Sequence, residues 1–428
     1  AAVMADLTGR PVKMRLDRDD DMRSTGKRHD FLIRYDAGFD TNGRILGIEF
    51  THALRCGISS DLSGPIADRA MFHSDNAYYL PNVSITSYRC KTNTVSNTAF
   101  RGFGGPQGML GIERVIDGIA QQLGIDPLSV RKTNLYGVDK RNITPYKMVV
   151  RDNVLPALIA ELELSSSYAE RRREIAAFNR NSPVIRKGIA LTPAKFGISF
   201  TTTFLNQAAA LVHVYKDGSV HLNHGGTEMG QGLMIKIAQV VAEEFQIDLD
   251  RVKISATNTG KGPNTSATAA SSGTDMNGMA ARSAARKIKR RLVKFASRKF
   301  AVAPSEIRFS DNRMKAGESE ISFAELAEQA WLGRISLSAT GFYRTPKIHY
   351  DPQTSSGRQF LYFAYGAAVS EVEVDCLTGE SRITRVDILY DAGKSLNPAI
   401  DIGQLEGGFV QGAGWLTSEE VWWDTKGH

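Results

Sequence analysis

Residues 208–232 read AAALVHVYKDGSVHLNHGGTEMGQG, and this stretch contains the structural unit on which the chain is built. Apolar and polar residues alternate on both sides of Asp217-Gly218, and alternation around an Asp-Gly pair predicts a β-hairpin. A glycine-rich turn, residues 224–232, follows the second strand and leads into a helical pattern from Gln231 to Gln246. The stretch therefore predicts a strand pair joined to a long helix by a turn whose backbone can approach a ligand closely.

The same hairpin pattern occurs twice more, around Asn42-Gly43 and around Thr378-Gly379. Helical patterns lie between and after the hairpins. Runs of strands followed by long helices favour an α+β fold with mixed sheets over a doubly wound parallel sheet. The helical patterns cover Gly108–Leu123, Leu155–Glu163, Gln231–Gln246, Asp275–Phe300 and Gly403–Trp415.

A chain of 428 residues exceeds what one hydrophobic core usually supports, so we expect two domains. We expect residues 1–140 to be the C-terminal part of a first domain, 141–186 a connecting segment, and 187–428 a second domain truncated at its C-terminus. The sequence begins as if inside a helix and stops without a natural end. Both features predict an internal piece of a larger unit.

The three cysteines, Cys56, Cys90 and Cys376, are far apart and form no CxxC pair. They argue against a disulfide framework and against zinc or iron–sulfur sites built from this chain alone. The histidines have no metal-binding spacing, and the pair His221 and His224 is typical of a structural or surface pair in a strand. No apolar run approaches the roughly 18–20 residues of a membrane helix, and no signal peptide is recognisable. We therefore expect a cytoplasmic protein with no membrane partner.

Basic residues exceed acidic ones by 53 to 46, a net charge of +7, and much of the excess lies between Ala281 and Phe300. Ile288, Leu292 and Phe295 recur there at helical spacing, with arginines and lysines on the other sides. This pattern predicts a packed helix with a solvated basic face. A nucleic-acid contact is the alternative, but no nucleic-acid-binding motif accompanies the segment, and we expect no nucleic-acid partner.

Four segments are rich in glycine, small polar residues or glutamine. Clustered glycines let a backbone approach a ligand, and the start of a helix offers unpaired N–H groups that suit an anion. None of the four contains GxxxxGK[ST] or a clean GxGxxG in a βαβ unit. They instead predict a large polar ligand with many hydrogen-bonding edges, such as a pterin that carries a phosphate. The segments are residues 100–108, 224–232, 264–275, which we expect to cap the next helix, and 403–414, which we expect to precede and enter one.

Five separated segments are distinctive when they occur together in this order. They are SNTAFRGFGGPQG (96–108), KFGISFTTTFLNQAAALVHVYKDGSV (195–220), HGGTEMGQG (224–232), GFYRTP (341–346) and SLNPAIDIGQLEGGFVQG (395–412). Through them the chain resembles the molybdopterin-binding region of the xanthine dehydrogenase family, a wider family that also includes aldehyde oxidases and carbon monoxide dehydrogenases. The resemblance extends over essentially the whole sequence and implies two elongated molybdopterin-binding domains of mixed sheets and helices.

The resemblance implies oxidative hydroxylation of hypoxanthine and xanthine to xanthine and urate, with oxygen derived from water. In the family, a molybdenum-bound hydroxide that a glutamate base activates attacks the ring carbon, and hydride passes to a sulfido ligand. Electrons then leave through two iron–sulfur (2Fe-2S) clusters to FAD and NAD. The resemblance places the clusters and FAD on other domains or a partner subunit, and it implies a dimer of the complete unit.

The candidate site residues follow from the same resemblance, position by position. Arg69 matches the arginine that polarises a purine oxygen, and it is the one catalytic group that we expect in this chain. Phe103 and Phe200 match the two rings that hold the purine, and Thr201 matches a hydroxyl contact to it. The other matches concern the cofactor: Arg101 and Ala270 beside molybdenum, and Gly230, Gln231, Ala269, Ala270, Ser271, Thr274 and Gln404 at the pterin or its phosphate.

Three departures from the family pattern limit what we expect of this chain alone. The Gly-Glu-Pro segment that carries the catalytic glutamate is expected beyond His428, and a Gly-Gly-Lys-Glu segment is expected before Ala1. Glu228 and Glu406 lie in glycine-rich segments, but neither matches the base. Gly273 stands where a serine is common. We therefore expect that this chain alone does not hydroxylate purines.

Two other functions stay open at this point. The first is an aldehyde oxidase, whose substrate pocket usually lacks an arginine at the position of Arg69. The second is a basic module that binds nucleic acid or serves assembly without catalysis.

Overall fold

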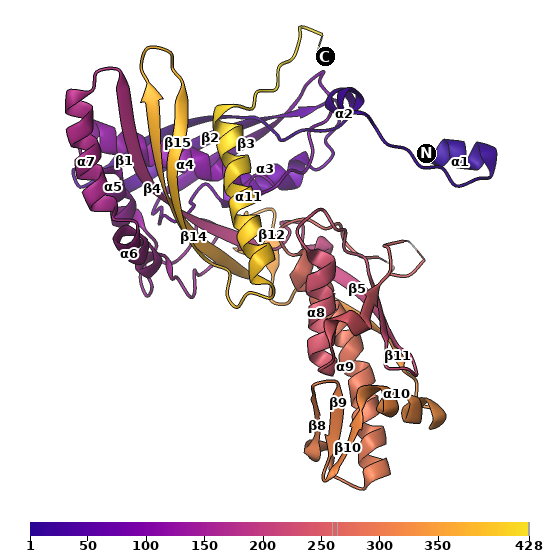
Figure 1. Cartoon of the computed structure of the whole chain (residues 1–428). Coiled ribbons are helices and arrows are strands. Elements are labelled where there is room, and N and C mark those ends of the chain that lie inside the picture. The colour runs from indigo at the N-terminus through magenta and orange to yellow at the C-terminus, as the bar shows by residue number, and fades with distance from the viewer. Residues whose placement is uncertain (259, 263, 427–428) are drawn as a thin grey trace. The chain divides into compact units, whose positions relative to one another are not determined.

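The computed structural model (Figure 1) describes residues 1–258, 260–262 and 264–426. By its internal contacts the chain divides into two compact units. The first unit comprises Ala1–Tyr136 together with the segment that begins at Glu420, and the second comprises Gly137–Glu419. Mixed sheets and helices occur in the chain, which confirms the α+β class expected from the sequence. The domain limits expected from the sequence stay a prediction.

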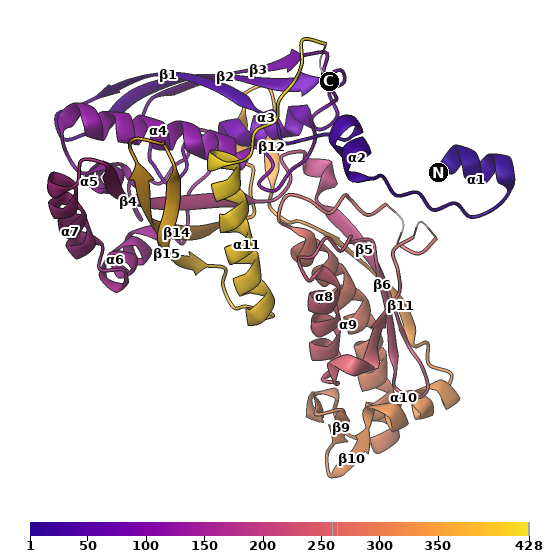
Figure 2. The same ribbon diagram turned by 45° about the horizontal axis from the view of Figure 1, so that its top comes forward.

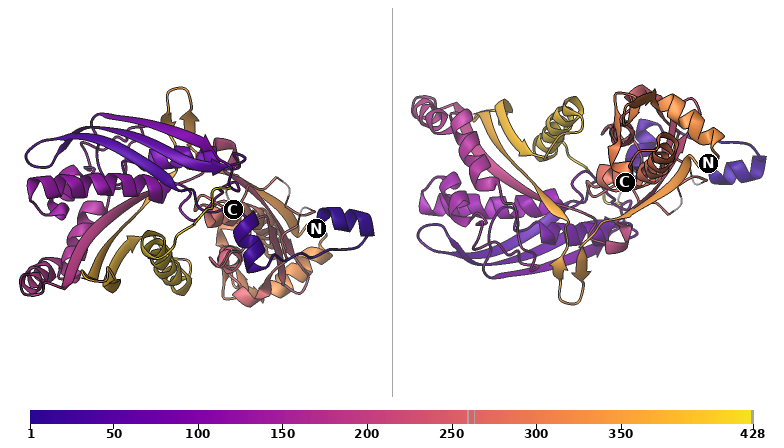
Figure 3. Two further views of the ribbon diagram at one scale, coloured as in Figure 1. Left: turned by 90° about the horizontal axis from the view of Figure 1, so that it is seen from above. Right: turned by 90° about the horizontal axis from the view of Figure 1, so that it is seen from below.

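The first unit is built on a three-stranded sheet in the order β1-β2-β3. β1 and β2 form the hairpin predicted around Asn42-Gly43, and β3 pairs parallel to β2. Helices α3 and α4 lie along one side of this sheet (Figures 2 and 3). The elements are α1 (Ala2–Thr8), α2 (Arg18–Ser24), β1 (Phe31–Phe39), β2 (Ile45–Gly57), α3 (Ser63–Phe72), β3 (Val83–Lys91), α4 (Gly105–Leu123) and α5 (Pro127–Asn134).

A buried ion network ties α5 to α4 inside the first unit. The Arg131 side chain is only 2% exposed, and its Nη2 lies 2.8 Å from Glu113 Oε2 and 2.9 Å from Asp117 Oδ1. The Tyr78 hydroxyl donates to Glu113 Oε1 at 2.6 Å. Burial alone would lower the pKa of Arg131, but Glu113 and the other anionic neighbours raise it overall, so the guanidinium stays charged. The buried charge is therefore compensated on two sides.

One sheet of the second unit has the order β15-β14-β4, with both pairs antiparallel. The hairpin predicted around Thr378-Gly379 joins β14 to β15. Helices α6 and α7 pack on this sheet, where Arg171 of α7 donates to Glu371 at 2.7 Å and to Asp387 at 2.8 Å. The elements are α6 (Leu155–Ser165), α7 (Tyr168–Asn181), β4 (Ile185–Ile198), β14 (Tyr362–Asp375), β15 (Ser381–Asp391) and α11 (Pro398–Thr417).

The other large sheet of this unit has the order β11-β5-β6-β7 and carries α8 and α9 (Figure 1). The hairpin predicted around Asp217-Gly218 joins β5 to β6. The elements are β5 (Gln207–Val214), β6 (Val220–His224), α8 (Leu233–Phe245), β7 (Val252–Ile254), α9 (Gly273–Phe300) and β11 (Ser338–Arg344). The second unit also contains smaller elements: β8 (Ile307–Ser310), β9 (Arg313–Ala316), β10 (Ser319–Ser322), α10 (Phe323–Leu332), β12 (His349–Asp351), β13 (Ser356–Arg358) and the 3₁₀ turns Thr203–Leu205, Leu249–Arg251 and Pro304–Glu306.

Small residues allow α9 to lie directly on β11. A Cβ atom placed on Gly341 would be 1.9 Å from the carbonyl oxygen of Ala280, so this strand position has no room for a side chain. Ala280 and Ala284 are fully buried at the same contact. Because the backbones touch, α9 is fixed in both depth and register on the sheet.

Two details of the sequence analysis are wrong. Residues 403–414 form no turn, because α11 already begins at Pro398, where the Asn397 side chain accepts the N–H of Ile400 and proline fits the first helical position. Ser272 precedes α9 without capping it, since its hydroxyl donates to the Ala269 carbonyl. Within the described residues, no helix has both the length and the apolar character needed to cross a bilayer.

We expect Arg131→Met to lower the free energy of unfolding of the first unit by about 3–5 kcal/mol, because Glu113 would keep its buried carboxylate without its cation. Urea unfolding monitored by circular dichroism measures this. Arg114→Met, on the exposed face of the same helix as Glu113, is the matched control and should change stability by less than about 0.5 kcal/mol. Equal midpoints for the two variants would contradict a structural role of the network.

Candidate functional site

The turn between β6 and α8 is held open by its own side chains. Glu228 accepts hydrogen bonds from the N–H groups of Gly230, Gly232 and Met234, each at 3.0 Å. The Gln231 amide accepts from Met229 N at 2.6 Å and donates to the Thr227 carbonyl at 2.9 Å. The backbone of Gly230 is exposed at φ 98°, with no atom within 4 Å of where a Cβ would stand. At Gly230 the turn therefore presents backbone to its surroundings.

The segment before α9 contains backbone strain beside this turn. Ala270 and Ser271 both have left-handed φ values, 59° and 56°, which cost free energy in residues that have a Cβ. The two segments are joined, because Thr227 N donates to Thr268 Oγ1 at 2.8 Å. Two consecutive strained residues at the start of a long helix are typical of functional loops.

The beginning of α11 meets the same turn from a distant part of the sequence. Gln404 Nε2 donates to the Gly230 carbonyl at 3.4 Å across 174 positions. Lys236 of α8 forms an ion pair with Asp401 at 2.5 Å. A Cβ on Gly232 would stand 2.6 Å from the Ile400 side chain. Residues 224–232, 268–273 and 400–404 thus lie together, and we refer to them as the cofactor cradle.

Buried polar atoms lie at the base of the cofactor cradle. His224 is 1% exposed, and its Nδ1 accepts the N–H of Gly226 at 3.1 Å, while its Nε2 has no partner among the described residues. Burial lowers the pKa of His224 to about 4, so the ring is neutral at pH 7 and Nε2 carries the proton. Asn277 Oδ1 is likewise buried without a recorded partner. Buried groups of this kind call for a water or ligand partner.

Opposing effects act on the carboxylates of this region. Burial raises the pKa of Glu228, but the N–H groups of Met234, Gly232 and Gly230 outweigh it and lower the pKa overall. Burial raises the pKa of Asp275, and the hydroxyl of Tyr362 offsets only part of this effect by donating at 2.7 Å. The Glu228 carboxylate thus stabilises the turn, and it does not have the raised pKa that suits a general base at neutral pH.

These groups fit a large polar cofactor such as molybdopterin. Exposed glycine backbone, the uncapped start of α9, the amides of Gln231 and Gln404, and the buried donor of His224 supply hydrogen-bonding groups of both kinds. Within the described ranges, no group of three or more His, Cys, Asp or Glu side chains could hold a metal ion.

In the first unit, the glycine-rich turn packs directly on α3. A Cβ on Gly104 would stand 2.2 Å from the Ile66 carbonyl, and one on Gly108 would stand 2.1 Å from the Ala70 carbonyl. These two contacts bracket Arg69, which is fully buried. Phe103 of the turn is also buried and has φ 52°. The structure therefore brings two of the expected substrate residues, Arg69 and Phe103, onto neighbouring segments.

Arg101, which we expect beside molybdenum, lies in the same turn. Its carbonyl accepts a hydrogen bond from Arg28 Nη1 at 2.8 Å, and the Arg28 guanidinium lies 4.3 Å from the centre of the Phe100 ring. The Arg101 residue is exposed. Arg28 therefore fixes the backbone at this position, a contact that the sequence did not reveal.

Phe200 and Thr201 follow β4 in the second unit, and both are buried. The Asn206 side chain accepts Phe200 N at 2.7 Å and donates to the Phe200 carbonyl at 3.1 Å, while Gln359 donates to the Thr201 carbonyl at 2.7 Å. Phe200 of this loop and Ala270 of the cofactor cradle both contribute to the large hydrophobic core of this unit. A cleft of about 590 Å³ begins at the same loop, lined by residues that include Phe204, Gln207 and Arg344.

The sequence did not single out Thr227, Thr268 and the buried His224 as contacts of the cofactor cradle. Thr227 and Thr268 meet only in the fold, since they are 41 positions apart, whereas the contact of His224 with Gly226 is local. The sequence shows that Glu228 does not match the base, but nothing in its position indicates that it would accept hydrogen bonds from three N–H groups. The recurrence of threonine inside two glycine-rich segments is the one signal that could have indicated a contact between them.

Family models of a molybdopterin cofactor-binding domain match residues 1–135 and 161–428. The chain is 47% identical over 98% of its length to a xanthine dehydrogenase/oxidase of Felis catus, and 45% identical over its whole length to a xanthine dehydrogenase of Oryza sativa. It spans about 30% of the length of each of these relatives.

Among solved structures, the quinoline 2-oxidoreductase of Pseudomonas putida 86 aligns with a TM-score of 0.86 at 22% identity, covering 99% of this chain and 55% of that chain. The aldehyde oxidoreductase of Desulfovibrio gigas aligns with a TM-score of 0.81 at 23% identity, covering 99% of this chain and 43% of that chain. At such identities the likeness concerns the fold.

We expect Gln231→Ala to lower the molybdenum content of the purified holoenzyme and not only its turnover, because the amide holds both ends of the turn. Metal analysis by mass spectrometry measures this. Gln121→Ala, at an exposed position of α4, is the control and should keep its full molybdenum content. Full metal occupancy in Gln231→Ala would argue that the turn does not retain the cofactor.

A pH dependence follows from Glu228. Its pKa is lowered in the folded turn, so the carboxylate stabilises the turn above the unfolded pKa, and this contribution is lost as pH falls through the folded pKa. Cofactor release should therefore accelerate in acid. Glu228→Gln should release cofactor faster at neutral pH, with a weaker acid dependence.

Glu325→Gln is the matched control, because Glu325 also has a lowered pKa but caps α10 instead. This variant should follow the unmodified protein at every pH. If Glu228→Gln also releases cofactor at the rate of the unmodified protein at every pH, Glu228 does not hold the turn.

Proposed function

Because this chain belongs to the molybdopterin cofactor-binding domain family and corresponds to that region of the xanthine dehydrogenases, we propose that it serves oxidative hydroxylation of purines. The proposed reaction converts hypoxanthine to xanthine and xanthine to urate, with oxygen taken from water. The observation that carries the proposal is the cofactor cradle, in which segments that match the family are brought together by the Gln404–Gly230 and Thr227–Thr268 contacts.

When bound, the molybdenum cofactor would supply the oxygen transfer and accept the electrons. We propose that Gly230, Gln231 and Gln404 hold the pterin, and that Ala269, Ser271 and Thr274 contact the pterin or its phosphate. In this arrangement the Gly230 N–H group stays engaged with Glu228, so Gly230 would contribute through the shape of its backbone. Arg101 and Ala270 are proposed to lie beside the metal through their backbone.

Arg69 is the residue on which the choice of a purine depends. As a purine is attacked, negative charge spreads over the ring and gathers partly on the exocyclic oxygen. A guanidinium remains charged at any accessible pH and can donate two parallel hydrogen bonds to such an oxygen. The complete burial of Arg69 excludes water and strengthens this interaction as charge develops, which would lower the barrier.

Phe103, Phe200 and Thr201 are proposed as further substrate contacts. Their burial supports this role, since buried aromatic rings confine a planar ligand without loss of side-chain entropy. The φ of 52° at Phe103 supports it also, because strained residues concentrate at ligand sites.

The remaining parts of the reaction are proposed to lie outside the described chain. The chain spans about 30% of its relatives' length, which leaves room for 2Fe-2S clusters and FAD on other domains or a partner subunit. We propose that electrons pass through them to NAD, that the complete unit is a dimer, and that it works in the cytoplasm.

An aldehyde oxidase activity is the second candidate, and the likeness in fold to an aldehyde oxidoreductase favours it. An aldehyde develops its charge on the oxygen of the attacked carbon and has no remote acceptor for Arg69. The two candidates therefore differ in what they require of this residue.

We expect Arg69→Met in the holoenzyme to reduce turnover of xanthine by roughly 10²–10³, the usual cost of losing one preorganised donor. Turnover of a small aromatic aldehyde such as benzaldehyde should be nearly unchanged or improved. Steady-state kinetics on both substrates, at equal molybdenum content, measure this.

Arg69→Lys is tested beside Arg69→Met, because lysine keeps the positive charge but lacks the paired donors. Its turnover of xanthine should lie between those of the unmodified enzyme and Arg69→Met. Arg89→Met, which removes a half-exposed arginine of the same unit, is the control. Equal losses on both substrate types would contradict the purine assignment.

A further inference from the structure

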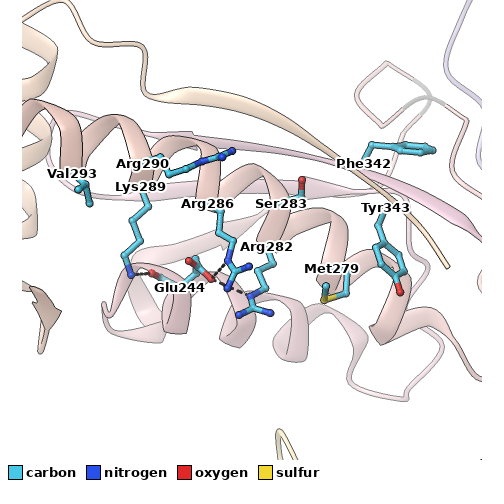
Figure 4. Close-up of a pocket in the computed structure, with 10 residues that line it drawn as sticks. All are labelled: Glu244, Met279, Arg282, Ser283, Arg286, Lys289, Arg290, Val293, Phe342 and Tyr343. Atoms are coloured by element: carbon cyan, nitrogen blue, oxygen red, sulfur yellow. Dashed lines mark hydrogen bonds and ion pairs between the residues drawn. The ribbon is translucent and has the colours of Figure 1, made fainter. Parts of the chain in front are cut away.

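A cleft of about 680 Å³ runs along α9 in the second unit, beginning more than one turn beyond the start of that helix (Figure 4). Its volume lies in the range of small-molecule sites, roughly 300–1,000 Å³. Neither the family resemblance nor the proposed reaction uses it. It is lined by Glu244 of α8, by Met279, Arg282, Ser283, Arg286, Lys289, Arg290 and Val293 of α9, and by Phe342 and Tyr343 of β11.

Three arginines follow one another at intervals of four along the cleft. Arg282, Arg286 and Arg290 therefore lie on one face of α9, with a rise of about 6 Å between successive members. Lys289 lies beside the last of them, and the four cations face a single lining carboxylate, that of Glu244. Four positive charges and one negative charge leave the lining at +3, and +2 if the neighbouring Glu243 is included.

Glu244 organises the arginines instead of neutralising them all. Its Oε2 accepts Nε of Arg282 and Nε of Arg286, both at 3.1 Å, and its own side chain is only 13% exposed. Lys289 donates to the backbone carbonyl of Glu244 at 2.5 Å. Among the described residues, the terminal nitrogens of Arg282 and Arg286 and the whole of Arg290 have no recorded acceptor. Glu244 thus orients the guanidinium ends of Arg282 and Arg286, and all three arginines are available to an anion.

The other end of the cleft is aromatic. Phe342 is 54% exposed and Met279 is 39% exposed, although both are large apolar side chains. Figure 4 shows Phe342, Tyr343 and Met279 at one end, with Lys289 and Arg290 toward the other. Nucleic-acid bases stack on exposed rings of this kind with a gain of roughly 1–3 kcal/mol per base.

We propose that this cleft binds a nucleoside di- or triphosphate, with its base against Phe342 and its phosphates on Arg282, Arg286 and Arg290. Guanidinium groups recognise phosphate through paired hydrogen bonds, and three at helical spacing can contact successive phosphate groups. The limited volume and the aromatic end favour a small ligand over a polynucleotide or an acidic protein segment. The proposal is independent of the proposed hydroxylation.

Calorimetric titration of the purified holoenzyme with ATP at low salt tests the proposal. The double variant Arg286→Gln/Arg290→Gln should bind ATP at least tenfold more weakly, because it loses charge-assisted hydrogen bonds from two guanidiniums. Arg298→Gln, at an exposed position of the same helix outside the cleft, should bind as the unmodified holoenzyme does. Added salt should weaken binding, since the cleft is open to solvent.

Inorganic triphosphate lacks a base, so its binding tests the arginine end of the cleft separately from the aromatic end. Phe342→Ala should weaken ATP binding about tenfold and leave triphosphate binding unchanged, because only the nucleoside contacts the ring. Equal loss for both ligands would overturn the placement of the base. Absence of ATP binding at millimolar concentration, or binding of oligo(dT) or polyglutamate without ATP, would overturn the proposal. Circular dichroism of every variant confirms that the fold is retained.

Discussion

The direct contact between β11 and α9 determines the position of most functional features of the second unit. Gly341 has no space for a side chain against the Ala280 carbonyl, so the helix can occupy only one depth and register on the sheet. Its first turn then meets the strained residues Ala270 and Ser271. Its middle turns present Arg282, Arg286 and Arg290 on the outer face. One close backbone contact therefore fixes both the cofactor cradle and the basic cleft.

The cofactor cradle shows how a turn can be held ready for a ligand without being filled by its own side chains. Glu228 takes up three backbone N–H groups, and Gln231 closes the turn on itself. Backbone strain at Ala270 and Ser271 and the buried Nε2 of His224 destabilise the fold, and contacts with a bound cofactor can offset this destabilisation. Preorganisation of this kind reduces the entropy lost on binding.

Arginines have three different roles in this chain, and their surroundings separate them. Arg131 and Arg171 are each compensated by two carboxylates and join elements within a unit. Arg282 and Arg286 share one carboxylate and remain partly exposed. Arg69 is fully buried between two close backbone contacts, those of Gly104 and Gly108 with α3. Burial and the number of acidic partners, not residue type, indicate which arginines stabilise the fold and which suit a ligand.

The sequence by itself determined the local structure and the family. The three hairpins follow from Asn-Gly, Asp-Gly and Thr-Gly pairs between alternating residues, because backbone chemistry at a turn is local. The long helices follow from apolar spacing, although α11 begins earlier than its glycines indicated, since Asn397 and Pro398 govern its start.

Only the tertiary structure decided which segments meet. The contact of Gln404 with Gly230 spans 174 positions, and the pairing of Glu244 with Arg282 and Arg286 joins two helices. Such contacts depend on the packing of whole elements, which no local pattern encodes. The sequence predicted a solvated basic face on α9, but β11 and α8 turn part of that face into a cleft.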